Sequence, residues 1–137
     1  MADVFSKEKR SRIMSRIKGR DTKPEILVRS LIHRMGFRFR IQRRDLPGNP
    51  DIVLPRRGKV IFVNGCFWHG HKRCKRSKRP TTNEAFWNKK LDGNIERDKR
   101  FRRELRRLGW TILVIWECET QNQDKLMSKL ERFLNDR

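Results

Sequence analysis

The stretch that decides the fold runs from residue 51 to residue 64 and reads DIVLPRRGKVIFVN. Its first part, Asp51–Leu54, predicts a short strand. Its last part, Lys59–Val63, is apolar after the lysine and predicts a strand in the centre of a sheet. Because Arg56-Arg57-Gly58 predicts a turn between them, we expect the two strands to pair as a hairpin.

A third strand is predicted by Trp110–Trp116, which directly follows a long helical stretch. A helix between two strands is typical of a crossover connection, so this strand is expected to lie parallel to a neighbour. A further half-buried strand is predicted over Phe37–Gln42, where apolar and polar residues alternate. The turn-forming cluster Leu46–Pro50 predicts a loop after it.

Helices complete the expected architecture. Thr22, followed three residues later by Glu25, forms a capping box that predicts a helix start, and Gly36 predicts its end. A second helix is expected from about Glu84 to Leu108, with a break at Gly93, and an amphipathic helix closes the chain. The order helix, three strands, helix, strand, helix predicts a mixed-sheet α/β domain with helices on its faces. The expected buried positions of the first and last helices are Ile26, Leu27, Leu31, Ile32, Met35, Leu126, Leu130, Phe133 and Leu134.

The composition points to a polyanionic partner. The chain has 137 residues, with 36 Lys and Arg against 16 Asp and Glu, so its net charge is +20. Such a charge on a small protein repels itself, and phosphates are the obvious neutralising ligand. Charge alone leaves DNA, RNA and an anionic membrane open, and does not separate a binder from an enzyme. No apolar run is long enough to span a membrane and no secretory signal is visible, which favours the cytoplasm.

The length predicts one domain preceded by a basic arm. Residues 7–20 are mostly basic, while Ile13, Met14 and Ile17 share one helical face. We therefore expect an arm over residues 1–20 that becomes helical on its partner, and a single domain over residues 21–137.

Cysteine and histidine spacing predicts a metal site. Cys66, His71 and Cys74 read C-x₄-H-x₂-C, and Cys118 follows the third strand. Three thiolates and one imidazole complete a tetrahedral Zn²⁺ shell with no open position, which is typical of a structural site. His69 is an alternative imidazole ligand because it lies two residues from His71. The other interpretation is three unrelated cysteines near a stray histidine.

A candidate chemical centre is predicted where the first two strands come together. Asp51 opens one strand and Asn64 closes the next, so a hairpin of this length brings Asp51 near Val63. A carboxylate beside main-chain carbonyls is a hard-oxygen site suited to Mg²⁺. His69 could act as a general base and Glu25 could supply a second carboxylate. The alternatives are that Asp51 caps a turn, Glu25 serves only its capping box and His69 is a loop residue.

Aromatic residues interrupt the polar loop that carries the cysteines. Phe67 and Trp68 lie inside this loop, and Phe86-Trp87 opens the following helix. Aromatic rings beside cations can stack on bases or wedge between them. The alternative for these rings is packing within the loop.

Several short motifs match one known family in a single register, from the N-terminus to about Cys118. The most specific is Gly65-Cys66-Phe67-Trp68-His69, next to the metal-ligand candidates. On these motifs the sequence resembles the very-short-patch repair (Vsr) endonucleases, bacterial nickases that act on one strand at T:G mismatches. The supporting motifs are Arg20-Asp21-Thr22 with Glu25, Leu46-Pro47-Gly48 with Pro50-Asp51, His71, Phe86-Trp87, Asn94–Asp98, Gly109-Trp110 and Trp116-Glu117-Cys118.

The resemblance implies a restriction-endonuclease-like fold, related to the PD-(D/E)XK nucleases, with structural zinc on Cys66, His71, Cys74 and Cys118. It implies that Asp51 holds a catalytic Mg²⁺ together with the main-chain carbonyl of Val63. It further implies that His69 activates the water and that Glu25 and Asp98 support the centre. By the same resemblance, the residues that wedge into the duplex are Phe67, Trp68 and Trp87, with Met14 entering from the opposite groove.

Three departures from the family pattern stand out. Asn64 replaces the histidine of the family pattern, which removes one titratable group from the catalytic set. Val63 replaces a threonine, a change that a carbonyl ligand tolerates. The spacing from His71 to Cys74 is one residue longer, which a loop can absorb.

The sequence therefore predicts a Mg²⁺-dependent endonuclease that nicks duplex DNA on the 5′ side of the thymine in a T:G mismatch. We expect a monomer in the bacterial cytoplasm, associated with the nucleoid when it acts, and with no membrane partner. Two rivals are a non-catalytic zinc-stapled DNA-binding module and a nuclease of the same fold without mismatch specificity.

Overall fold

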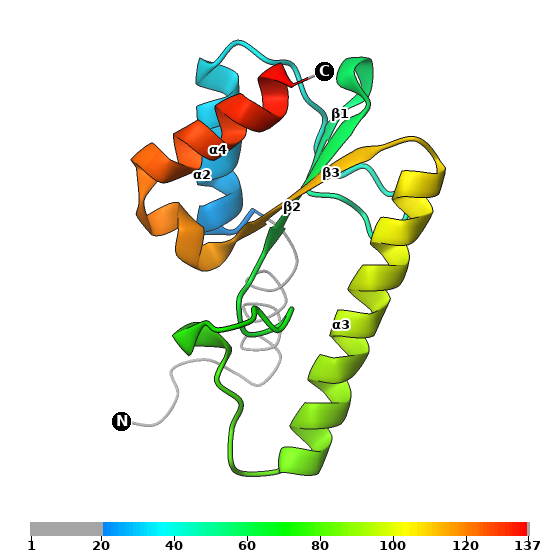
Figure 1. Ribbon diagram of the computed structural model, residues 1–137, viewed down its shortest axis with the longest axis vertical. Coiled ribbons are helices and arrows are strands. Elements are labelled where there is room, and N and C mark those ends of the chain that lie inside the picture. The colour runs from blue at the N-terminus through cyan, green and yellow to red at the C-terminus, as the bar shows by residue number, and fades with distance from the viewer. Residues whose placement is uncertain (1–20, 137) are drawn as a thin grey trace, which may run out of the picture.

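The computed structural model describes residues 21–136, so the predicted basic arm and Met14 lie outside the described residues. Figure 1 shows the arrangement of the elements, which are α2 (Lys23–Arg34), β1 (Ile52–Leu54), β2 (Lys59–Asn64), α3 (Glu84–Arg107), β3 (Thr111–Trp116) and α4 (Gln123–Asn135). Within these residues, three short 3-10 segments complete the fold. One follows β1, one lies in the Cys/His loop (residues 65–80), and one links β3 to α4.

The sheet has the strand order β1-β2-β3 and is mixed. β1 and β2 pair antiparallel, with Ile52 opposite Ile61, and β2 and β3 pair parallel, with Val60 opposite Ile112. Gly58 takes the left-handed conformation (φ 64°) that the turn between β1 and β2 requires. The predicted hairpin, the central position of β2 and the parallel crossover are all confirmed.

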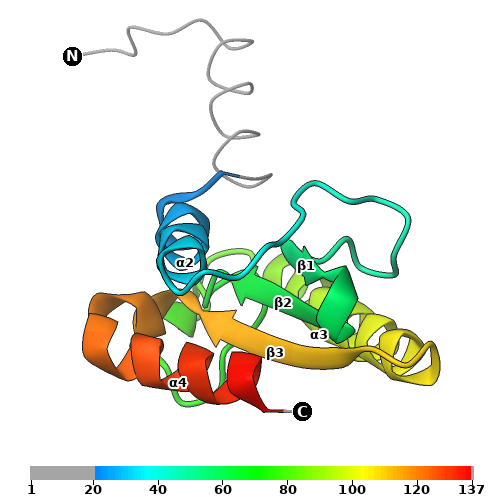
Figure 2. The same cartoon turned by 90° about the horizontal axis from the view of Figure 1, so that it is seen from above.

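Two apolar clusters hold the helices on opposite faces of the sheet. α2 and α4 lie beside one another on one face, while α3 covers the other (Figures 1 and 2). Because side chains alternate across a strand, Ile61 packs with α2 and α4 while Val60 packs with Leu105 of α3. Because only α3, among the described helices, covers this second face, the Cys/His loop can meet α3 near the end of β2 (Figure 1).

The first helix begins as predicted, although its buried face differs. The Thr22 hydroxyl accepts the Glu25 N–H at 3.4 Å, and Gly36 (φ 86°) follows the C-terminal end. Ile26, predicted to be buried, is 52% exposed, whereas Val28 is fully buried. The helix is therefore rotated relative to the predicted face, and Glu25 is buried with the core side.

Two predictions about secondary structure were wrong. Phe37–Gln42 forms no strand, because only Arg40 pairs with Val53 and Gln42 (φ 56°) turns the chain away. α3 also continues through Gly93 without a break. One exposed glycine in a helix costs only about 1 kcal/mol relative to alanine, and the buried Leu91 nearby secures this part of the helix.

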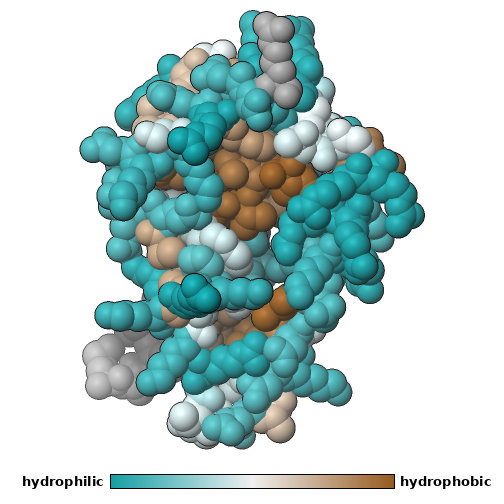
Figure 3. Space-filling view, viewed as in Figure 1, coloured by the Kyte–Doolittle hydropathy of each residue, from teal (hydrophilic) through white to brown (hydrophobic). Residues whose placement is uncertain are grey.

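Polar side chains cover most of the surface. Figure 3 shows a mainly hydrophilic face with an apolar area over the sheet between the flanking helices. Within residues 21–136, no helix is both long and apolar enough to cross a membrane.

Candidate active site and metal cluster

Asp51 and Val63 come together because β1 is shorter than β2. The last pair between the strands is Ile52 with Ile61, so Val63 extends beyond β1. Its N–H donates instead to Oδ2 of Asp51 at 2.6 Å. In a strand the N–H and C=O of one residue point to the same side, so the Val63 carbonyl also faces the edge where Asp51 lies. The predicted neighbours are thus brought together.

The carboxyl group of Asp51 lies in an unfavourable place for a charge. Burial raises the pKa of Asp51 from its ordinary value of 3.8 to about 7, and the nearby carboxylate of Glu25 acts in the same direction. The hydrogen bond from Val63 and the charge of Arg29 act against this rise without cancelling it. The negative charges of Asp51 and Glu25 are therefore only partly balanced by nearby donors and cations. Together with the Val63 carbonyl oxygen, these two carboxylates form a donor set that fits a hard divalent cation.

Replacing Asp51 with Asn is therefore expected to stabilise the protein in Mg²⁺-free buffer. Since the folded pKa lies above the unfolded one, ionisation of Asp51 lowers stability as pH rises from about 4 to about 7. An amide keeps the acceptor for Val63 without the charge. We expect the free energy of unfolding to rise by roughly 1–3 kcal/mol at pH 8 and to change little at pH 4.

Urea unfolding at the two pH values measures this difference. Asp45→Asn is the matched control, because Asp45 is exposed in the loop before β1. If the free energy of unfolding of Asp51→Asn at pH 8 is no higher than that of the wild type, the ionised carboxylate of Asp51 does not destabilise the folded protein.

His69 and Asp98 form a pair next to this carboxylate. Nδ1 of His69 lies 2.6 Å from Oδ2 of Asp98, which projects from the middle of α3. A carboxylate only accepts, so Nδ1 carries the proton and Nε2 is left free to accept one. When His69 is protonated, its charge lowers the pKa of Asp51. The structure therefore gathers Asp51, Glu25, His69 and Asp98 at one end of the sheet.

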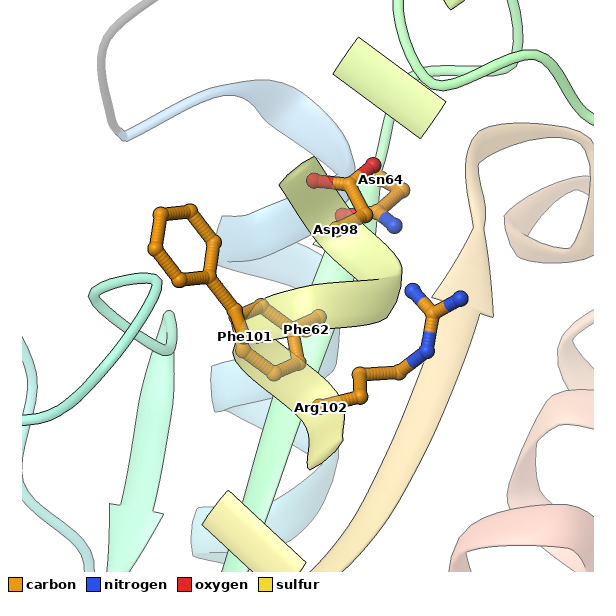
Figure 4. A pocket seen from close by; sticks show the side chains of 5 residues that line it. All are labelled: Phe62, Asn64, Asp98, Phe101 and Arg102. Carbon is orange, nitrogen blue, oxygen red and sulfur yellow. The ribbon is translucent and has the colours of Figure 1, made fainter. Parts of the chain in front are cut away.

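Asn64 lies on the α3 side of β2. It is only 5% exposed and lines a small pocket beside Asp98. Figure 4 shows Arg102 reaching from α3 into the same space, with Phe101 on the other side of the helix. Asn64 is thus adjacent to the His69–Asp98 pair, but it offers an amide where a histidine would offer a titratable ring. The five residues of the pocket are Phe62, Asn64, Asp98, Phe101 and Arg102.

The four predicted metal ligands form one cluster. The ligand atoms of Cys66, His71, Cys74 and Cys118 all lie within 4.8 Å of one another. Tetrahedral zinc places its sulfur ligands about 3.8 Å apart and a sulfur and a nitrogen about 3.6 Å apart. Sγ of Cys118 and Nδ1 of His71 are 3.5 Å apart, which agrees with that geometry. His69 is turned to Asp98 instead, so His71 is the imidazole of the cluster.

The surroundings of the cluster suit a bound cation. Cys66 is fully buried, and burial raises the pKa of its thiol to about 12. A cation would be needed to hold this sulfur as a thiolate at neutral pH. The ring of His71 stacks on Trp116 with the centroids 4.2 Å apart, and the Ser77 hydroxyl donates to the main-chain carbonyl of His71 at 2.6 Å, so the ring and the backbone of this residue are each held by a neighbour.

The Cys/His loop is also fastened to α3, by residues that sequence reasoning did not assign. The side-chain N–H of Asn94 donates to the Trp68 carbonyl at 3.0 Å, one helical turn before Asp98 binds His69. Ile95 lies between these two contacts on α3. Gly70 (φ 62°) approaches it so closely that a Cβ added to the glycine would lie 2.4 Å from the Ile95 side chain. Motif spacing gives no signal for such contacts, because they depend on how the loop folds back onto the helix.

An aromatic cluster projects from this fastened loop. The rings of Phe67, Trp68 and Trp87 lie with centroids 5.1 to 6.0 Å apart, and Phe86 adds a fourth, exposed ring. The predicted aromatic residues are therefore brought together, at the end of α3 that extends beyond the sheet (Figure 1).

A mixed sheet whose central strand ends beside a half-buried carboxylate and a histidine–aspartate pair, on a strongly basic chain, is the arrangement of an α/β protein of the nuclease type. A family model described as DNA mismatch endonuclease Vsr matches residues 2–76. The chain belongs to this family and is a DNA endonuclease or nickase.

Relatives and a solved structure agree with this assignment. The chain is 44% identical over 126 residues to "DNA mismatch endonuclease Vsr" of Escherichia coli (strain K12), covering 92% of this chain and 80% of that protein. It is 42% identical over 135 residues to "Type II nicking enzyme V.XorIIP" of Xanthomonas oryzae pv. oryzae, covering 98% of each. The catalytic domain of the homing endonuclease I-Bth0305I superposes with a TM-score of 0.56 at 24% identity, over 82% of this chain and 94% of that one, which supports the fold alone.

Proposed function

We propose that this protein nicks one strand of duplex DNA on the 5′ side of the thymine in a T:G mismatch, by Mg²⁺-dependent hydrolysis. The observation that carries the proposal is the placement of Asp51, Val63 and the His69–Asp98 pair at one end of the sheet, next to the aromatic cluster. Similarity to one relative named as a DNA mismatch endonuclease and to another named as a nicking enzyme supports the same activity.

Asp51 and the Val63 carbonyl would hold Mg²⁺, with Glu25 as a further carboxylate. When bound, Mg²⁺ would neutralise charge on the attacked phosphate and lower the pKa of the attacking water. His69 would take the proton of that water at Nε2, because Asp98 holds Nδ1. Asp98 would then stabilise the protonated ring. Asn64 would contribute an amide hydrogen bond from the adjacent pocket rather than a proton.

Mismatch selection would follow from the cost of opening the base stack. Phe67, Trp68 and Trp87 present rings that can stack on bases once the helix is opened. A mismatched pair is already weakened, so a wedge enters there at the lowest free-energy cost. The Cys/His cluster would hold structural zinc and so fix the loop that carries two of the three rings. The rest of the surplus Lys and Arg would grip the phosphate backbone without reading sequence. We further propose that the basic residues 1–20 serve as a DNA-binding arm on a single domain, which acts as a monomer.

The test of this function compares nicking of two duplexes that share one sequence, one fully paired and one with a single T:G mismatch. We expect cleavage of the thymine strand of the mismatched duplex only, and no cleavage in Mg²⁺-free buffer. Equal rates on both duplexes would replace the proposal with a nuclease of the same fold that lacks mismatch specificity. That rival has support of its own, because relatives at about 40% identity include type II nicking enzymes.

Trp87→Ala is expected to reduce the preference for the mismatched duplex. Base stacking on an aromatic ring contributes about 1–3 kcal/mol, so we expect nicking at the mismatch to slow by roughly 5- to 150-fold. Single-turnover rates on the two duplexes measure the change. Leu108→Ala is the matched control, since Leu108 is an exposed apolar residue just beyond the other end of α3. If Trp87→Ala leaves the ratio of the nicking rates on the mismatched and the paired duplex unchanged, this ring does not take part in the wedge.

A further inference from the structure

We propose that Arg29 and Asp21 form a clamp that holds one carboxylate oxygen of Glu25 and leaves the other free for the Mg²⁺ site. The proposal rests on the Mg²⁺-dependent activity proposed above and assigns two positioning residues to it. Neither residue touches the reacting atoms; both would act through Glu25.

Two hydrogen bonds of the Glu25 carboxylate fall on the same oxygen. Oε2 accepts from Nη2 of Arg29 at 3.0 Å and from the main-chain N–H of Asp21 at 2.9 Å. Nη1 of Arg29 in turn binds Oδ1 of Asp21 at 2.7 Å, which closes a ring of three residues. The Thr22 hydroxyl is a further, weaker hydrogen-bond partner of the Glu25 carboxylate. Oε2 is therefore fixed twice, which sets the direction in which Oε1 points.

Two features of this ring are unfavourable for folding by themselves. Asp21 takes a left-handed backbone conformation (φ 59°), which few residues with a side chain adopt and which Asp and Asn tolerate best. Nε of Arg29 is buried and has no hydrogen-bond partner among the described residues. Strained backbone and unpaired buried donors gather where a site needs a particular geometry. Here both contribute to the placement of one carboxylate.

Arg29 also differs from the many basic residues that face solvent. Its side chain is 16% exposed, and its charge acts on Asp51 as well as on the Glu25 that it binds. A guanidinium that is committed to two carboxylate partners is less available to the DNA backbone than an unpaired surface arginine is. Carboxylates that bind metals are commonly held by such a second hydrogen-bonding residue, which orients the ligand oxygen.

The test combines Arg29→Met with Glu25→Gln in a double-mutant cycle. We expect Arg29→Met to slow single-turnover nicking about 10- to 100-fold, and Arg29→Lys to recover most of the loss because lysine can still bind Oε2. In the Glu25→Gln background, Arg29→Met should add less than about twofold. Arg34→Met is the matched control, since Arg34 ends the same helix in an exposed position.

A second readout separates positioning from charge. Removal of a cation beside two carboxylates would by itself tighten Mg²⁺ binding, whereas loss of a fixed ligand oxygen would weaken it. We therefore expect Arg29→Met to raise the Mg²⁺ concentration needed for half-maximal nicking, and to diminish the rise in melting temperature that Mg²⁺ gives to the DNA-free protein. If Arg29→Met does not fold, Asp21→Ala tests the clamp from its outer side, because the Asp21 side chain is 52% exposed.

The outcomes are distinguishable. Independent losses that multiply in the double mutant, or an unchanged or lowered Mg²⁺ requirement in Arg29→Met, would overturn the clamp. The clamp would also be overturned if Glu25→Gln and Asp51→Ala nick slowly while Arg29→Met nicks at the wild-type rate. In that case the proposed function would stand. Wild-type rates in both Glu25→Gln and Asp51→Ala would remove the proposed catalytic site itself.

Discussion

Asp51→Ala is expected to lower the rate of nicking by at least about a thousandfold while leaving DNA binding largely intact. Asp51 is the carboxylate that would hold Mg²⁺ together with the Val63 carbonyl, so its removal withdraws the main ligand charge. In the proposed function, DNA binding would depend on other parts of the molecule: the basic surface and the aromatic cluster on the Cys/His loop and α3. Catalysis and affinity should therefore separate in this variant.

Two measurements test the separation. Single-turnover nicking of a T:G duplex follows catalysis, and fluorescence anisotropy of the same duplex follows binding in Mg²⁺-free buffer. Asp45→Ala is the matched control, because Asp45 is an exposed acidic residue of the preceding loop whose partner is Arg43. It should bind and nick as the wild type does.

Each of the other outcomes identifies a different error. Nicking that persists in Asp51→Ala would show that the metal is held elsewhere. Loss of both nicking and binding, with an unchanged melting curve, would mean that Asp51 contributes to DNA contact. A wild-type protein that binds but never nicks, at any Mg²⁺ concentration, would favour the non-catalytic zinc-stapled module.

The predicted fold elements that hold in the structure are those with a local physical cause. The hairpin of β1 and β2 follows from two apolar runs and a glycine turn within 14 residues, and the parallel β3 follows from the long helix before it. The strand predicted over Phe37–Gln42 was wrong, because alternating apolar and polar residues form a strand only where a partner strand is available. β1 offers three residues, and just one of them pairs with Arg40.

The candidate site shows the same division. The cysteine cluster was predictable because the chain has only three cysteines, and every one of them lies in the cluster. Arg29 was not predictable, since nothing in its local sequence sets it apart from the other 35 Lys and Arg residues except its place on a rotated helix face. Asn94 is similar, because its bond to the Trp68 carbonyl depends on a loop that folds back over 26 positions.

The proposed base and two rings of the proposed wedge lie between candidate metal ligands along the chain, which gives the Cys/His cluster a wider importance. Cys66 and His71 belong to the candidate metal cluster, and Phe67, Trp68 and His69 fall between them. The His71 N–H donates to the Cys66 carbonyl at 2.9 Å, so the segment is already drawn into a tight turn. A metal at this cluster would close the turn and fix both the wedge and the proposed base.

Loss of the metal is therefore expected to have the largest effect on stability. Purified protein should contain about one zinc atom per chain. Structural zinc binds with about 10–16 kcal/mol in small zinc domains. Here the two apolar clusters sustain part of the fold, so we expect a smaller effect: His71→Ala should lower the melting temperature by at least about 10 °C, corresponding to ~2–4 kcal/mol for a domain of this size. Nicking should be lost as well, because the loop that carries His69 is no longer held.

Metal analysis, thermal melts and Co²⁺ substitution test this prediction together. Co²⁺ in place of zinc should give the intense visible absorption of a tetrahedral site with thiolate ligands, and that absorption should vanish in Cys66→Ser. His33→Ala is the matched control, since His33 is exposed near the end of α2 and far from the cluster in sequence. If His33→Ala and His71→Ala melt alike, or if the purified protein holds no zinc, the four residues do not form a metal site. Retention of zinc in His71→Ala with loss of zinc in His69→Ala would instead make His69 the imidazole ligand, against its contact with Asp98.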